Sequence, residues 1–192
     1  MKTPGRPQRR LGTLIIIGTV PAALIGGLYQ DKFEEIFSSP SKVAALLLVT
    51  GVLLIASEAV ARRRRQIDEL RISDTGIIGL AQAVAIAPGI SRSGATISMG
   101  LFLGFTREAA ARFSFLLSIP IIAGATLVKL RHGMGDSPEG QAALVLGFLA
   151  AALSGFAAIR FLLGYVRRHN LRVFALYCWV VGIGVLLWHL VV

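Results

Sequence analysis

Long apolar runs separated by short polar segments dominate this chain. Five of the runs are each near the roughly 20 residues that a helix needs to cross a bilayer. They are Leu11 to Tyr29, Val43 to Val60, Phe113 to Val128, Ala142 to Leu163 and Val173 to Val191. The first run is too long for the apolar region of a signal peptide, and no A-x-A cleavage site closes it. The pattern predicts an all-α integral membrane protein, with one membrane domain over residues 1–192 and five transmembrane helices.

A sixth apolar stretch, residues 75–105, is interrupted in the middle by Pro88-Gly89. Each half, 75–87 and 93–105, would form a helix of about 20 Å, whereas the hydrocarbon core of a bilayer is about 30 Å thick. Neither half can cross the membrane alone. We therefore predict a re-entrant helical hairpin, and the alternative is one long kinked helix that crosses once.

The distribution of charge favours the hairpin. Of the 20 Lys and Arg residues, 15 lie in the segments 1–10, 61–74, 106–112 and 160–172. Only a hairpin places all four segments on one side, which the positive-inside rule assigns to the cytoplasm. We predict a basic cytoplasmic tail at residues 1–10 and a C-terminus on the outer side. The net charge of +10 therefore indicates membrane topology and no nucleic-acid partner.

The predicted hairpin turn carries an arginine at membrane depth. Such an arginine costs roughly 2.5 to 3.5 kcal/mol on insertion scales, so Arg92 should face a cavity or a partner rather than lipid. A half-helix that begins near Ser91 would also present free backbone N–H groups and the positive end of its dipole. Because a guanidinium binds phosphate in bidentate geometry, this turn predicts a pyrophosphate site.

Other residues of the turn fit the same site. The hydroxyls of Ser91, Ser93 and Thr96 add donors, and two glycines, Gly89 and Gly94, would let the backbone approach the ligand. The alternative is a polar seam between helices, in which Arg92 pairs with Glu58 and the hydroxyls donate back to backbone carbonyls. A second interpretation of Glu58 is a carboxylate at the interface that pairs with Arg62 or Arg63, within a basic run that anchors the topology and contacts anionic lipid. Gly100 and Gly104 predict a close helix contact.

At this turn the sequence resembles the second signature of bacterial undecaprenyl-diphosphate phosphatases. The resemblance rests on Gln82-Ala83, on Pro88-Gly89 and on the run from Ser91 to Ile97. Three other segments are similar to that family in the same order, and the resemblance covers nearly all of residues 11–192. They are Val20 to Ala23, Leu53 to Glu58 and Phe113 to Pro120.

The resemblance implies the C-terminal portion of an inverted-repeat fold and an enzyme of the plasma membrane that hydrolyses undecaprenyl diphosphate to the monophosphate. The active site would face the outer side of the membrane and would use a divalent cation, Mg or Ca. The resemblance also allows a homodimer. Ser91, Arg92 and Thr96 would be catalytic, with Gln82, Gly89, Ser93 and Gly94 binding substrate. For Gln82 the alternative is a buried amide satisfied by a neighbouring carbonyl.

The family also has a first signature, of the form Glu-Gly-x-Thr-Glu-Phe-Leu-Pro-x-Ser-Ser-x-Gly-His, which the sequence does not contain. No metal ligands are evident, since the three histidines have no metal-ligand spacing. We therefore expect an N-terminally incomplete chain whose missing signature is encoded upstream. Without those carboxylates, a polyprenyl-phosphate carrier or transporter module is the alternative function, because broken helices also bind anions in transporters.

Overall fold

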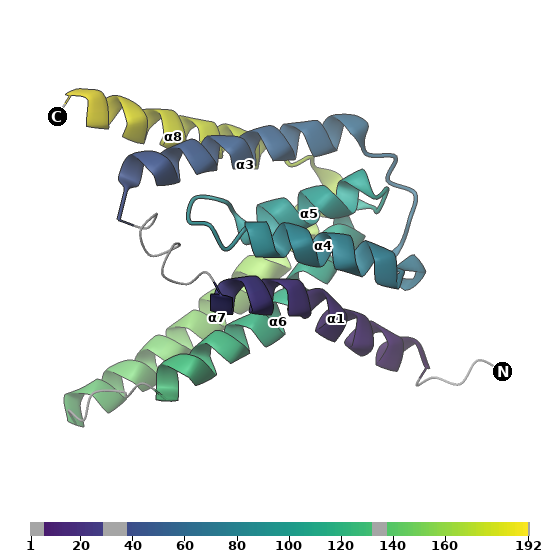
Figure 1. The fold of residues 1–192 in the computed structure, drawn as a ribbon, viewed down its shortest axis with the longest axis horizontal. Helices are drawn as coiled ribbons and strands as arrows, with labels where there is room; N and C mark the ends of the chain where they lie inside the picture. The colour runs from purple at the N-terminus through teal and green to yellow at the C-terminus, as the bar shows by residue number, and fades with distance from the viewer. Residues whose placement is uncertain (1–5, 29–37, 132–137, 192) are drawn as a thin grey trace.

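The computed structural model describes residues 6–28, 38–131 and 138–191 (Figure 1). In this part of the chain seven α-helices and one 3₁₀ turn are present. They are α1 (Arg6–Leu28), α3 (Pro40–Val60), η1 (Ile67–Glu69), α4 (Ile72–Val84), α5 (Arg92–Phe102), α6 (Arg107–Arg131), α7 (Pro138–Arg168) and α8 (Arg172–Val191). Five helices, α1, α3, α6, α7 and α8, are long and apolar enough to cross a membrane, which confirms the predicted spans.

Close contacts at glycines hold the spans together. Helices α3 and α8 lie side by side along the top of Figure 1, where a Cβ at Gly51 would overlap the indole of Trp179. That indole donates a hydrogen bond to the Leu48 carbonyl at 3.2 Å. Helix α1 meets α4 in the same way, since a Cβ at Gly79 would overlap the backbone of Gly18. Small residues thus allow backbones to approach where lipid gives no hydrophobic driving force.

The stretch predicted as a re-entrant hairpin is a hairpin, and one residue shows it most directly. Arg65 donates from Nη1 to the Asp74 carboxylate at the start of α4 and to the Leu103 carbonyl at the end of α5, both at 3.1 Å. Its guanidinium also lies 4.2 Å from the centre of the Phe105 ring. The hydrogen bond with Asp74 raises the pKa of Arg65 above its ordinary value. Both ends of the hairpin therefore meet at Arg65, which excludes the kinked single crossing.

Helix α4 has the predicted length of 13 residues but begins and ends three residues earlier, and α5, with 11 residues, is two residues shorter than predicted. Helix α4 ends at Val84, before Pro88, and turns then occupy the residues up to α5. Pro88 disfavours helical backbone at Ala87, so the helix could not have continued through the turn. Gly104, expected on a packing face of α5, instead ends that helix with φ of +86°. The bonds from Phe105 N to Gly100 O and from Gly104 N to Leu101 O form a Schellman motif. The contact expected at Gly100 is present, against Ala110 of α6.

The basic segments gather at one end of the molecule. Arg10 of α1 donates to the Leu70 carbonyl at 2.9 Å, and Arg167 of α7 pairs with Glu108 of α6 at 2.6 Å. Residues 107–112, predicted as part of a connection, are the first turns of α6, because Thr106 accepts a hydrogen bond from Ala109 N and ends the preceding loop. The hairpin predicts that all four basic segments lie at one end of the molecule, and the fold agrees with this prediction.

This arrangement predicts the labelling of single cysteines in intact membranes, in a Cys178→Ser background. Cysteines at positions 62 and 167 should both react with an impermeant maleimide from one side, and a cysteine at Ser39 should react from the other. Reaction of positions 62 and 167 from opposite sides would contradict the fold. Labelling at all three positions after detergent permeabilisation controls for reactivity.

Candidate functional site

The tip of the hairpin, residues 85–91 between α4 and α5, is built around a glycine whose φ angle lies in the left-handed region. Gly89 has φ of +95°, and a Cβ there would overlap the Val43 carbonyl oxygen and approach Leu46 of α3. Only glycine combines this backbone conformation with so close an approach. The close approach expected at Gly89 is thus made to α3, and Gly94 likewise faces the Thr50 methyl group. The tip is fixed against the part of α3 from Val43 to Thr50.

A buried threonine of α3 positions the turn. The hydroxyl of Thr50, 1% exposed, accepts a hydrogen bond from Ser91 N at 3.1 Å. Its hydrogen can be donated to the Gly89 carbonyl or to the Leu46 carbonyl, each 3.3 Å away. Thr50 therefore bridges the last residues of the turn to α3. Its role could not be predicted from the sequence, because Ser91 lies 41 residues further along the chain.

Ser91 caps α5 and leaves donors available at the helix start. Its hydroxyl accepts from Gly94 N at 3.1 Å and lies 3.3 Å from the Ser93 hydroxyl. In the described part of the chain, the N–H groups of Arg92 and Ser93 have no hydrogen-bond partner, as the first turn of a helix requires. Two amides and the positive end of the α5 dipole thus form an anion-binding position.

The Arg92 side chain is exposed and makes no hydrogen bond or ion pair with the residues that the structure describes. The alternative in which Arg92 pairs with Glu58 is therefore wrong. Glu58 instead binds Arg63, as the second interpretation expected, and also Arg107 and the Leu171 N–H. The first turn of α5 thus carries a guanidinium and two backbone amides that have no partner among the described residues.

Thr96 has its hydroxyl engaged inside the protein. This residue is 2% exposed, and its Oγ lies 2.6 Å from the hydroxyl of Ser114 on α6 and 2.8 Å from the Arg92 carbonyl. Thr96 thus joins α5 to α6, and its bond to the Arg92 carbonyl is the one that the polar-seam alternative expected of a hydroxyl. Its expected direct role toward substrate stays a prediction.

Gln82, in the last turn of α4, is the least satisfied polar side chain near the tip. The residue is 2% exposed, and its Nε2 has no hydrogen-bond partner in the described residues. The satisfied amide that the sequence allowed as an alternative is therefore not what the structure has. A buried donor without a partner costs about 1 to 3 kcal/mol, so a ligand acceptor would relieve it.

A divalent cation does not suit the donors at the tip. The described residues there offer hydroxyls, amides and a guanidinium, whereas Mg²⁺ and Ca²⁺ take carboxylate and carbonyl oxygens. Over residues 6–28, 38–131 and 138–191, no group of three or more acidic, His or Cys side chains could hold a metal. The cation implied by the resemblance remains an expectation, and the chemistry below does not use it.

We expect Thr50→Val to loosen the tip. The change keeps the shape of the side chain but leaves Ser91 N without its acceptor, which should lower the free energy of unfolding by about 1 to 3 kcal/mol. Differential scanning fluorimetry in detergent measures the effect. Thr50→Ser should restore stability, and Thr126→Val is the matched control, because the Thr126 hydroxyl bonds only within α6. Equal melting temperatures for Thr50→Val and wild type would contradict this role.

Gln82→Met separates a binding role from a structural one. Removing an unpaired buried amide should keep or raise the melting temperature, whereas loss of a donor to a charged diphosphate should weaken binding about tenfold or more. Both are measured on one purified sample, with a polyprenyl diphosphate as ligand. Unchanged affinity would show that Gln82 does not contact the ligand.

Comparison with known proteins adds an independent finding. The family model described as "Bacitracin resistance protein BacA" matches residues 1–184 of this chain. A protein of Methanothermobacter thermautotrophicus named undecaprenyl-diphosphatase is 55% identical over 177 residues, which cover 90% of this chain and 97% of that protein. Proteins of the same name from Halothermothrix orenii and Rubrobacter xylanophilus are 45% and 47% identical. The matches cover 95% and 89% of this chain, but 71% and 64% of those proteins.

Proposed function

This chain belongs to the bacitracin resistance protein BacA family, and from that premise we propose that it hydrolyses undecaprenyl diphosphate to undecaprenyl phosphate and inorganic phosphate. The observation that carries the proposal is the anion-binding position at the start of α5. The first turn of α5 there carries the exposed Arg92 and two backbone N–H groups, all without a partner in the described residues. The relatives named above act on this diphosphate according to their names.

The donors of the tip suit a diphosphate whose charge grows during reaction. Water adds to the terminal phosphorus, the bridging P–O bond breaks, and the lipid monophosphate leaves with the bridging oxygen. Arg92 can hold two phosphoryl oxygens with its planar fork, while the amides of α5 supply fixed dipoles. The Ser91 and Ser93 hydroxyls add two donors that can turn toward the ligand.

The tip is placed for a substrate that comes from the outer side. Its contacts on α3, from Val43 to Thr50, lie about 15 to 26 Å from the basic end of that helix near Val60, at 1.5 Å per residue. With the basic end in the cytoplasm by the positive-inside rule, the diphosphate binds in the outer half of the membrane. A polyprenyl chain then stays among lipids while its head group reaches Arg92.

The test is phosphate release from undecaprenyl diphosphate by the purified chain in liposomes, with empty liposomes as control. Release that rises with protein and is lost in Arg92→Ala supports the proposal. Binding of the lipid diphosphate, abolished by Arg92→Ala but without any phosphate release, would instead support the carrier or transporter alternative and overturn hydrolysis by this chain.

A further inference from the structure

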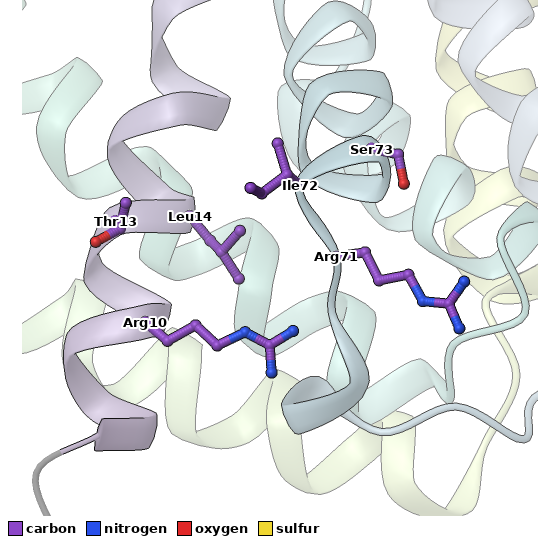
Figure 2. Close-up of a pocket in the computed structure, with 6 residues that line it drawn as sticks. All are labelled: Arg10, Thr13, Leu14, Arg71, Ile72 and Ser73. Atoms are coloured by element: carbon purple, nitrogen blue, oxygen red, sulfur yellow. The ribbon is translucent and has the colours of Figure 1, made fainter.

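The pocket at the base of the hairpin does not bring its donors together. It lies between the first turns of α1 and the start of α4 (Figure 2). There the side chains of Arg71 and Ser73 point away from Arg10, whose guanidinium is already bound to two backbone carbonyls. At the other end of the hairpin, the Ser93 N–H in the first turn of α5 has no partner in the described residues. The direction of this free donor therefore matters for an anion bound at the tip.

The free N–H of Ser93 belongs to the same peptide group as the Arg92 carbonyl. A peptide group is planar and almost always trans, so its N–H and C=O point in opposite directions, and fixing the oxygen fixes the direction of the N–H. The Arg92 carbonyl oxygen accepts a hydrogen bond from the Thr96 hydroxyl at 2.8 Å. Because Thr96 is 2% exposed, this bond is made inside the protein. The protein thus holds one side of the peptide and leaves the other side for a ligand.

A buried serine of α6 completes this arrangement. The Ser114 residue is 4% exposed, and its hydroxyl lies 2.6 Å from the Thr96 hydroxyl. Because the Arg92 carbonyl can only accept, the Thr96 hydrogen is donated to that carbonyl, and Ser114 is the donor in the 2.6 Å contact. The hydrogen bonds then run in one direction, from Ser114 through Thr96 to the peptide that carries the Ser93 N–H. Such chains polarise their members, which makes the last N–H a stronger donor.

Helix α6 supports this chain of bonds along the length of α5. The two helices run in opposite directions, since Gly100 of α5 packs on Ala110, whereas Thr96, one turn nearer the tip, bonds Ser114, one turn further along α6. The neighbouring Phe113 is 1% exposed. Ser114 is therefore held by packing, on a helix that runs beside α5 toward its first turn.

We propose that Ser114 is a positioning residue of the diphosphate site, which acts through Thr96 to hold and polarise the Ser93 N–H. The inference rests on the proposed function, because it assigns a task within that same site. During hydrolysis negative charge grows on the phosphoryl oxygens, and a fixed N–H stabilises that charge without having to reorient. Ser114 does not touch the substrate, since its buried hydroxyl is bound to Thr96.

The test compares phosphate release from a polyprenyl diphosphate in liposomes by Ser114→Ala and Ser57→Ala. Ser57 is the matched control, because its buried hydroxyl also bridges α5 to a neighbouring helix, at 3.2 Å from the Ser98 hydroxyl, but has no bond to Thr96. Ser114→Ala should lower kcat about tenfold, less than the loss of a whole donor, and leave KM nearly unchanged. Both variants should lower the melting temperature by a similar amount, whereas Ser57→Ala should keep the wild-type kcat.

A double variant tests the route of the effect. Because Ser114 acts through Thr96, Thr96→Val and the double variant Thr96→Val/Ser114→Ala should have the same kcat. Additive losses, an unchanged kcat in Ser114→Ala, or an equal loss in Ser57→Ala would overturn the inference.

A wild type that releases no phosphate contradicts the proposed function instead. The same variants are then compared by their affinity for the polyprenyl diphosphate, which Ser114→Ala but not Ser57→Ala should weaken. Equal affinities of these two variants would overturn the role of Ser114 in that case.

Discussion

Arg92→Lys loses nearly as much activity as Arg92→Ala. At the start of α5 the Arg92 guanidinium has no partner among the described residues, and its planar fork can hold two oxygens of one phosphate at once. A lysine keeps the charge but offers a single point of contact, so it cannot reproduce that geometry. Removal of one such stabilising group typically lowers turnover by about 10²- to 10³-fold. We expect both variants in that range, within about tenfold of each other.

The measurement is kcat/KM for phosphate release from a polyprenyl diphosphate in liposomes. Arg62→Lys controls for a general effect of replacing arginine on this basic protein. Near wild-type turnover in Arg92→Lys would show that charge alone is sufficient and would remove the bidentate role. Melting temperatures should stay unchanged in all three variants, because the side chains of Arg92 and Arg62 make no hydrogen bond or ion pair with the described residues.

Glu58→Leu should be the most destabilising single change. Glu58 is 5% exposed, and its two oxygens accept bonds from Arg63, from Arg107 at 2.7 Å and from Leu171 N at 2.9 Å. Removing the carboxylate leaves a partly buried guanidinium and an amide without their acceptor. Breaking a buried pair in this way costs about 3 to 5 kcal/mol. The loss should appear as a lower melting temperature and lower yield of folded protein from membranes.

Two variants make this prediction specific. Glu108→Gln removes a carboxylate that also binds two arginines, Arg112 and Arg167, but whose side chain is 32% exposed. Since exposed pairs contribute about 1 kcal/mol or less, its melting temperature should hardly change. Adding Arg107→Met to Glu58→Leu should recover part of the stability, because no unpaired charge then remains at that position. Similar losses for Glu58→Leu and Glu108→Gln would contradict the role of burial.

The spans and the hairpin could be predicted from the sequence because both follow from local patterns. The length of each apolar run determines whether it can cross, and Pro88-Gly89 marks the break. The partners of Glu58 were predicted only in part. Arg63 lies five residues away, whereas Arg107 and Leu171 lie 49 and 113 residues away and are brought in by the fold.

Gly104 shows the same limit at short range. A small-xxx-small spacing has the same appearance whether the helix continues or stops, and only the positive φ at Gly104 decides it. At the candidate site, the sequence suggested residues that would bind phosphate, which stays a prediction, but it could not indicate Thr50. The contact that holds the tip exists only once α3 and the hairpin have packed together.

Arg65 also bears on how the hairpin reaches its place during biogenesis. Because one side chain binds both ends of the hairpin, the segment enters and leaves the bilayer on the same side, and no loop has to be translocated. Because α3 precedes the hairpin in the chain, Thr50 is already made when the tip with Arg92 is synthesised and can bind it at once. We therefore expect this charged turn to take its place by packing against α3 through Thr50 and Gly89, and not by dissolving in lipid as the apolar spans do.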